Sequence, residues 1–164
     1  MKKILIVLIL VINSMGGFLE EGDIQAGQYN YEKAADLYTQ SCNTNNMMGC
    51  YNLSLLYSLG LGVEKNYEKT NQLQKQACKG ECFQACYDVG LGYIIGTRGR
   101  EKNYKKAFEL YKKACTGNNP DSCLALGTFY KNGTYVKKDI RKSKEMYQKA
   151  CDLGSTYSCE LAKK

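Results

Sequence analysis

The chain has 164 residues and a formal net charge of +7, and its length suits one ordinary domain. It contains no histidine, which excludes Ser-His-Asp and Cys-His nucleophile systems and histidine-ligated zinc on this chain. The charges are spread, with Lys beside Glu in most segments, and this pattern favours a solvated surface.

Residues 1–16 are typical of a secretory signal peptide. Two lysines are followed by the apolar run ILIVLILVI at 4–12 and by small residues at Ser14 and Gly16. The run is too short for a membrane span of roughly 20 residues. We therefore expect cleavage after Gly16, export to the periplasm or the medium, and no stable membrane insertion afterwards.

Eight of the nine cysteines define an internal repeat. They form four C-x7-C pairs, and the first members of successive pairs are separated by 36, 37 and 36 residues. A fixed period in this range is typical of a solenoid of stacked units. The pairs are Cys42/Cys50, Cys78/Cys86, Cys115/Cys123 and Cys151/Cys159.

Each period predicts two antiparallel helices. Apolar and small residues keep a helical register on both sides of each cysteine pair. Glycines at 60, 96 and 133 are suited to ending one type of helix. Asn66, Asn103 and Asp139 are suited to starting the other, and Asn46, Asn119 and Ser155 occupy an aligned position inside the cysteine pairs.

The sequence therefore predicts an all-α, α/α solenoid without long linkers. After the signal peptide at 1–16 we expect a first, abbreviated helix pair at 17–42. Three full repeats follow at 43–78, 79–115 and 116–151, and a capping helix closes the array at 152–164.

Each cysteine pair is predicted to form a disulfide. A cysteine in the last turn of one helix and another about one turn into the next face each other across the hairpin. Export favours oxidation. The spacing differs from the C-x2–4-C of zinc sites, so neither a metal nor a cofactor is expected.

Cys82 is the ninth cysteine and has no partner in this scheme. It occupies the position of Asn46 and Asn119, at the start of a predicted helix. The positive end of the helix dipole would lower the pKa of a thiol there. A reactive thiol, an intermolecular crosslink, competition for Cys78 or Cys86, and a helix-start residue without function all remain open.

Two stretches resemble Sel1-like repeats: DSCLALGTFYKNG at 121–133, and GCYNL at 49–53 followed by GLGV at 60–63. The paired cysteines make the chain similar to the Helicobacter cysteine-rich proteins, a secreted Sel1-like subfamily. Three departures are an extra residue in Gly96–Arg100, Gln74 in place of a tyrosine, and the additional Cys82.

The resemblance implies a right-handed superhelix with one disulfide per repeat. It also implies penicillin binding with weak β-lactamase activity, or a non-enzymatic scaffold that binds peptides, cell-wall fragments or a host protein. The residues give little support to the enzyme, because no S-x-x-K, S-D-N or K-T-G motif follows the signal peptide. Catalytic residues therefore stay unassigned.

A scaffold needs only a surface. Stacked helix pairs can present a groove, which Asn52, Asp88 and Thr128 could line with help from Tyr51 and Tyr87. Packing between helices is the alternative role for the tyrosines. A β-lactam, a peptidoglycan-like peptide or an extracellular protein is the expected partner. Nucleic acid is not expected, because the sequence lacks a basic stripe and any matching motif.

Overall fold

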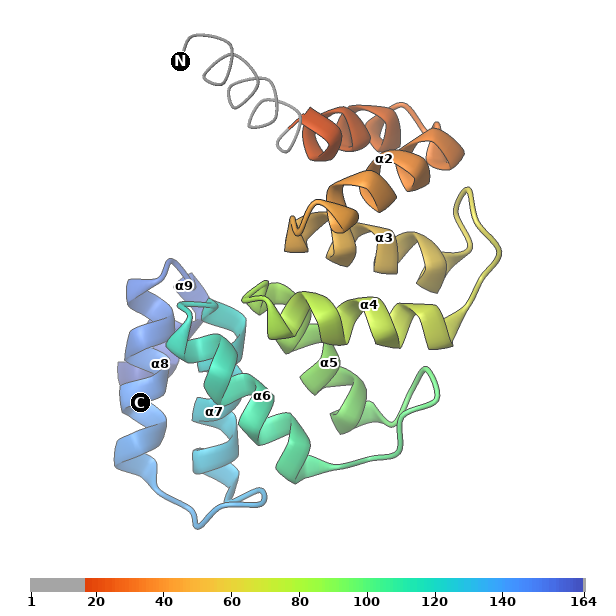
Figure 1. Ribbon diagram of the computed structural model, residues 1–164. Coiled ribbons are helices and arrows are strands. Elements are labelled where there is room, and N and C mark those ends of the chain that lie inside the picture. The colour runs from red at the N-terminus through yellow and green to blue at the C-terminus, as the bar shows by residue number, and fades with distance from the viewer. Residues whose placement is uncertain (1–16, 164) are drawn as a thin grey trace, which may run out of the picture. The chain divides into compact units, whose positions relative to one another are not determined.

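The computed structural model describes residues 17–163, and they form helices and no strands (Figure 1). Residues 17–27 are helical. Seven helices of 13 residues and one of eight follow. They are α2 (Tyr31–Asn43), α3 (Met47–Leu59), α4 (Tyr67–Lys79), α5 (Phe83–Ile95), α6 (Tyr104–Thr116), α7 (Pro120–Asn132), α8 (Ile140–Asp152) and α9 (Thr156–Lys163). The predicted all-α class is confirmed, whereas the signal peptide lies outside the described residues.

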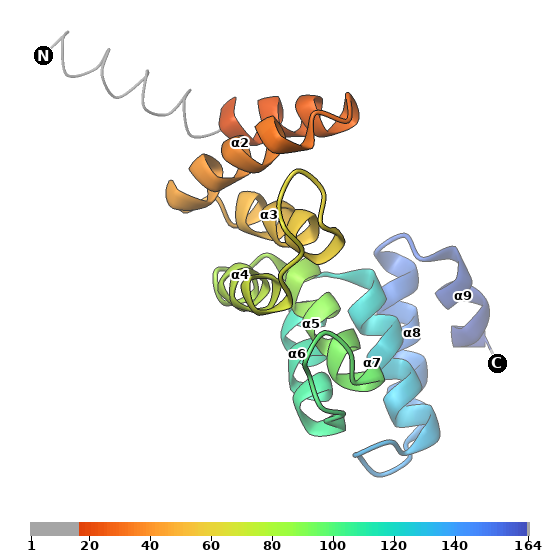
Figure 2. The same cartoon turned by 90° about the vertical axis from the view of Figure 1, so that its right-hand side faces the viewer.

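Two compact units divide the chain. Unit 1 ends at Gly80 and unit 2 begins at Glu81. In unit 1, α3 packs against both α2 and α4. In unit 2, each helix from α5 to α9 packs against the next along the chain (Figure 2).

Local sequence signals set the helix ends. The side chain of Asn46 accepts a hydrogen bond from Met48 N–H, and four of the other polar N-caps do the same for their own helices. These four are Asn66, Asn103, Asn119 and Asp139. Gly60, Gly96 and Gly133 end α3, α5 and α7 with φ of 70–75°, where a residue without Cβ costs least.

Disulfides join the two helices of a hairpin. The Cα atoms of Cys42 and Cys50 lie 4.5 Å apart, and those of Cys115–Cys123 and Cys151–Cys159 lie 4.7 Å apart. Cys78 and Cys86 are also disulfide-bonded. A nine-residue loop implies about 2.5 kcal/mol of stabilisation per bridge in the loop-entropy model. A disulfide in each repeat is thus part of the confirmed fold.

A tyrosine on one helix packs against a glycine on the preceding helix at three places. A Cβ added to Gly22 would lie 2.7 Å from the Tyr38 ring, and one added to Gly90 would lie 2.6 Å from the Tyr111 ring. Gly127 meets Tyr147 in the same way. Each ring is buried and needs the glycine surface to reach this depth.

A three-part contact, here called the Tyr–Lys clamp, ties each loop to the helix that follows it. In unit 1, Asn66 N–H donates to Tyr57 C=O at 2.9 Å, and the Asn66 side chain accepts from Lys69 N–H. Lys69 Nζ lies 4.8 Å from the centre of the Tyr57 ring. Unit 2 repeats the clamp at Tyr93/Asn103/Lys106 and at Tyr130/Asp139/Lys142.

Candidate functional site

The candidate binding surfaces lie at the edge of each unit where the Tyr–Lys clamps lie. We call it the loop edge. In unit 1 it comprises residues 28–33 and 60–69, and in unit 2 it comprises residues 96–106 and 133–142. In unit 1 these are the loops that precede α2 and α4, and in unit 2 they are the loops that precede α6 and α8. Each loop edge also includes the first residues of those helices.

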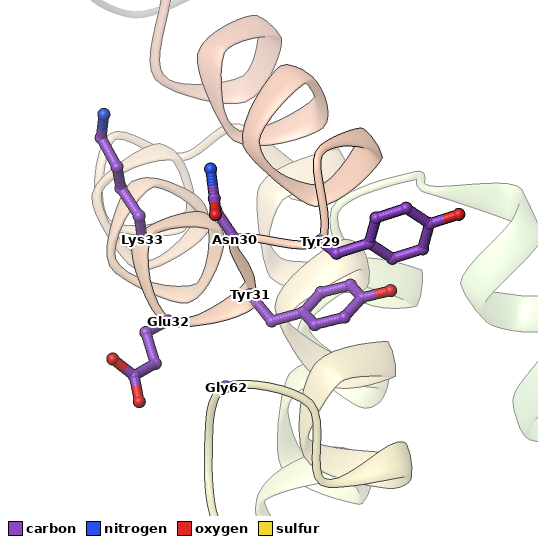
Figure 3. A pocket seen from close by; sticks show the side chains of 6 residues that line it. All are labelled: Tyr29, Asn30, Tyr31, Glu32, Lys33 and Gly62. Carbon is purple, nitrogen blue, oxygen red and sulfur yellow. The ribbon is translucent and has the colours of Figure 1, made fainter.

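Unit 1 has an open pocket of about 560 Å³ on its loop edge. The rings of Tyr29 and Tyr31 lie next to each other on one side, and Lys33 and Glu32 project on the other (Figure 3). The two ring centres are 6.1 Å apart, in an edge-to-face arrangement. Tyr29 is 78% exposed, so most of its ring surface is available to a ligand. The pocket is lined by Tyr29, Asn30, Tyr31, Glu32, Lys33 and Gly62.

Gly62 brings the α3–α4 loop against the start of α2. A Cβ added there would collide with backbone atoms of Tyr31 and Glu32, and its φ of 65° also favours glycine. Tyr135 is the equivalent residue of unit 2 in a loop of the same length, because each lies two residues after the glycine that ends a helix and four residues before the N-cap of the next helix. The Tyr135 ring instead packs on Phe108, with 5.7 Å between ring centres.

The pocket also lies where the Tyr–Lys clamp is incomplete. Asn30 N–H donates to Gln25 C=O, so a glutamine stands where the complete clamps have a tyrosine. The Asn30 side chain does not cap α2 and donates to Gln25 Oε1 at 3.0 Å. Within residues 17–163 no aromatic ring or carboxylate pairs with Lys33, whose ammonium group is therefore available at the pocket rim.

The loop edge of unit 2 is basic. Residues 17–80 hold five Lys/Arg against seven Asp/Glu, a net charge of −2, whereas residues 81–164 hold 16 against nine, a net charge of +7. The even spread of charge inferred above is therefore wrong at the scale of the units. Counting charge by half-chain would have revealed this asymmetry from the sequence.

The cations of unit 2 gather at equivalent positions of α6 and α8. We call the following set the basic edge, and all of its side chains are exposed. In both views the first turn of α6 and the loop before α8 lie at the lower end of unit 2 (Figures 1 and 2). The set comprises Lys102, Lys105, Lys106, Lys137, Lys138, Arg141 and Lys142.

The residues predicted to line a groove fall into both units. Asn52 lies in unit 1 and donates to Asp23 Oδ1 at 3.0 Å, and Tyr38 OH donates to the same oxygen at 2.7 Å. Burial, and then the bond to Asp23, raise the pKa of Tyr38. Asp88 and Thr128 lie in unit 2, so a groove shared by all three residues stays a prediction.

Most groove candidates are held by their own helices or by neighbouring rings. Asp88 accepts from Gln84 at 3.3 Å, and Thr128 donates to Leu124 C=O at 3.1 Å. Tyr87 packs against Tyr111 with ring centres 5.7 Å apart. Burial is the main cause of a raised pKa at both tyrosines. Tyr87 thus serves packing between helices in unit 2.

Cys82 is a free thiol, and it is buried with 8% exposure. Burial raises its pKa, and the backbone N–H groups of Ala85 and Gln84 oppose this only in part. The expected lowering by the helix dipole is therefore wrong, because desolvation of the thiolate outweighs the dipole. Such a thiol is poorly placed to react or to crosslink chains.

The described residues offer little nucleophilic chemistry. Six of the seven serines in residues 17–163 are buried, and the half-buried Ser155 shares a hydrogen bond with Ser158 at 2.8 Å. In the same residues, no group of three His, Cys, Asp or Glu side chains could hold a metal ion. A second open pocket, of about 450 Å³, lies between the start of α5 and the end of α6 and is lined mainly by charged residues.

The helical repeat agrees with known families. A family model described as the Sel1 repeat matches residues 12–45, 48–81, 83–119 and 120–155. The chain belongs to the Sel1-repeat family. No curated protein sequence matches it.

Solved structures place the fold in the same family. Helicobacter pylori cysteine rich protein B is 32% identical with a TM-score of 0.64, and the match covers 80% of this chain and 94% of that one. A Sel1 repeat protein from Oxalobacter formigenes is 23% identical with a TM-score of 0.83, over 92% of this chain and 63% of that one. A protective antigen of uropathogenic Escherichia coli with an SLR fold is 22% identical with a TM-score of 0.77.

These matches confirm an α/α solenoid of Sel1 repeats. The chain spans 63% of the Oxalobacter protein and 32% of the Escherichia coli antigen. Sel1-repeat proteins in general mediate interactions between proteins. A disulfide in each repeat indicates an oxidising compartment, either extracellular or periplasmic. No helix in residues 17–163 is long and apolar enough to cross a membrane.

Proposed function

We propose that this Sel1-repeat protein is an exported binding scaffold whose unit 1 pocket takes a short peptide segment. The observation that carries the proposal is the exposed Tyr29–Tyr31 pair beside a pocket of about 560 Å³. Tyrosine supplies a large contact area at a low cost in side-chain entropy, which is why binding surfaces are rich in it.

The pocket chemistry suits a peptide with one apolar or aromatic side chain. That side chain would pack against the rings of Tyr29 and Tyr31. Lys33 would pair with a carboxylate of the peptide, such as its C-terminus, and Glu32 would accept from amide N–H groups. The Gly62 backbone lies close against the start of α2, and a side chain there would displace that part of the pocket.

The proposal includes export through the signal peptide at 1–16, and the disulfide framework supports it. A host protein or a cell-wall stem peptide would both present such segments outside the cell. The penicillin-directed hydrolase is the weaker alternative, because the serines of the described chain are buried or hydrogen-bonded.

The test is a selection of random peptides on purified, oxidised protein. The selected peptides are then measured on Tyr29→Ser and on Tyr157→Ser, a matched control whose ring is 61% exposed on α9. We expect Tyr29→Ser to weaken binding about 30-fold or more, as at aromatic hot spots, and Tyr157→Ser to leave it unchanged. Equal loss in both variants, or no selected peptide, would contradict the proposal.

A cell-wall stem peptide and benzylpenicillin are then added as competitors. Displacement of the selected peptide by the stem peptide alone would identify a cell-wall ligand. Turnover of benzylpenicillin that persists in Tyr29→Ser would show that the protein hydrolyses penicillin at a site other than this pocket. The peptide-binding proposal would then not account for that activity.

A further inference from the structure

The basic edge differs from the equivalent positions of unit 1 in one consistent way. The second residue of α2 and of α4 is acidic, Glu32 and Glu68, whereas the second residue of α6 and of α8 is Lys105 and Arg141. The third residue of each of these helices is a lysine. The reversal at the second position, with Lys137 and Lys138 in the α7–α8 loop, makes this edge cationic.

These cations lie at unfavourable places for helix stability. The start of a helix has a partial positive charge, so acidic side chains are stabilising there and basic ones are not. Neither α6 nor α8 has an acidic residue in its first turn. The cations therefore oppose the dipole of the helix that carries them, and their placement calls for a reason other than stability.

Few carboxylates neutralise the basic edge. Arg141 pairs with Glu145 at 3.8 Å, and Lys142 pairs with Asp139 at 3.9 Å. Both pairs are long and solvated, so each contributes little. Within residues 17–163 no ion pair involves Lys105 or Lys138.

Large side chains lie among the cations and are half exposed. Tyr104 and Ile140 are the first residues of α6 and α8, and Tyr135 lies in the loop before α8. Their exposed fractions are 45%, 47% and 49%. Tyr135 is fixed to α6 by its contact with Phe108, which connects the loop before α8 to α6.

We propose that the basic edge is a peripheral docking surface for an anionic lipid bilayer. Lipid phosphates would contact the lysines and Arg141, while Tyr104, Tyr135 and Ile140 would enter the headgroup region. A soluble polyanion would pair with the cations but would offer no apolar contact for the exposed Ile140. This favours the bilayer. The basic edge lies in unit 2 and would bind lipid, whereas the pocket lies in unit 1 and would bind a peptide. The two proposals are therefore independent of each other.

The test measures sedimentation of purified, oxidised protein with vesicles. Phosphatidylcholine vesicles that contain about one third phosphatidylglycerol should bind the protein, and pure phosphatidylcholine should not. Binding should fall steeply in about 0.5 M salt, because the Debye length shortens. Equal binding to both kinds of vesicle would overturn the proposal.

The variant Lys105→Glu/Arg141→Glu gives α6 and α8 the residue that α2 and α4 carry at the same position. It should weaken vesicle binding by about 30-fold or more, since each cation near the surface contributes roughly a factor of five. Its Tm should stay within about 2 °C, because the gain of the new glutamates at the helix dipole is offset by their repulsion from Glu109 and Glu145, four residues further along α6 and α8. Loss of binding at an unchanged Tm cannot come from misfolding.

The matched control is Lys75→Glu/Lys112→Glu, which changes the net charge equally at exposed positions near the other ends of α4 and α6. It should leave vesicle binding within about twofold. A similar loss of vesicle binding in both variants would show that only the net charge of the protein matters, and it would overturn the proposal. Stronger binding to dextran sulfate than to vesicles, unaffected by Ile140→Ser, would also overturn it in favour of a soluble polyanion.

Discussion

The loop edges of unit 1 and unit 2 have the same backbone plan and opposite surfaces. Both have 13-residue helices, polar N-caps and Tyr–Lys clamps. Unit 1 has Gly62 and an open pocket where unit 2 has Tyr135 packed on Phe108. Unit 2 has cations where unit 1 has Glu32 and Glu68. The repeat therefore fixes where side chains lie, and a few substitutions decide what each edge can bind.

The largest effect is expected from giving unit 2 the small residue of unit 1. Ala35 occupies in α2 the position of Phe108 in α6. Phe108→Ala should destabilise the protein by about 3–5 kcal/mol, because the contacts with Phe129, Tyr130 and Tyr135 would be lost. Urea unfolding measures this, and a cost below 1 kcal/mol would show that the aromatic cluster does not hold unit 2 together.

Adding a side chain at Gly62 tests the close packing beside the pocket of unit 1. Gly62→Ala should cost about 3 kcal/mol, because the new Cβ meets the backbone of Tyr31 and Glu32 and the φ is positive. The same measurement on Gly99→Ala is the control, since a Cβ there meets nothing within 4 Å although its φ is also positive. Equal costs at the two glycines would mean that backbone strain alone matters.

The disulfides should contribute similarly in the two units. Cys115→Ala/Cys123→Ala and Cys42→Ala/Cys50→Ala should each lower the free energy of unfolding by about 2.5 kcal/mol, because both bridges close loops of equal length. A difference of more than about 2 kcal/mol between the two double variants would show that cavities, and not loop entropy, dominate.

Cys82 is the one N-cap among α3, α5 and α7 without a side-chain hydrogen bond. Cys82→Asn should stabilise the protein by about 1 kcal/mol, by copying Asn46 and Asn119.

In the unsubstituted protein, the raised pKa keeps Cys82 protonated at neutral pH. Its alkylation should therefore be slower than that of a solvent-exposed cysteine and should become faster as the pH rises. Rapid alkylation at pH 7 would contradict the burial of Cys82.

The smallest effect is expected at the Tyr–Lys clamps. Lys69→Met in unit 1 and Lys106→Met in unit 2 should each cost about 0.5–1 kcal/mol, because a neutral side chain of similar length loses the attraction to the ring. Lys33→Met, where glutamine replaces the clamp tyrosine, should be neutral. A cost at Lys33 equal to the other two would show that the cation–π contacts do not stabilise the clamps.

The sequence predicted what depends on short-range rules. The helix pairs, the caps at Asn66 and Gly60, and a disulfide in each repeat follow from residues close together along the chain. The burial of Cys82 did not follow, because it depends on surrounding side chains. The pocket at Tyr29 and Tyr31 did not follow either, because it needs Gly62 from another loop, although an alignment of Gly62 with Tyr135 would have indicated it.

A peptide ligand should bind the loop edge of unit 1 and not that of unit 2, and amide hydrogen exchange measures this segment by segment. Amide exchange is measured with and without a peptide selected on the purified protein. We expect slower exchange in residues 28–36 and 60–66 and no change in residues 96–106 and 133–142. Protection that is confined to the basic edge of unit 2, or is spread evenly over both loop edges, would contradict it.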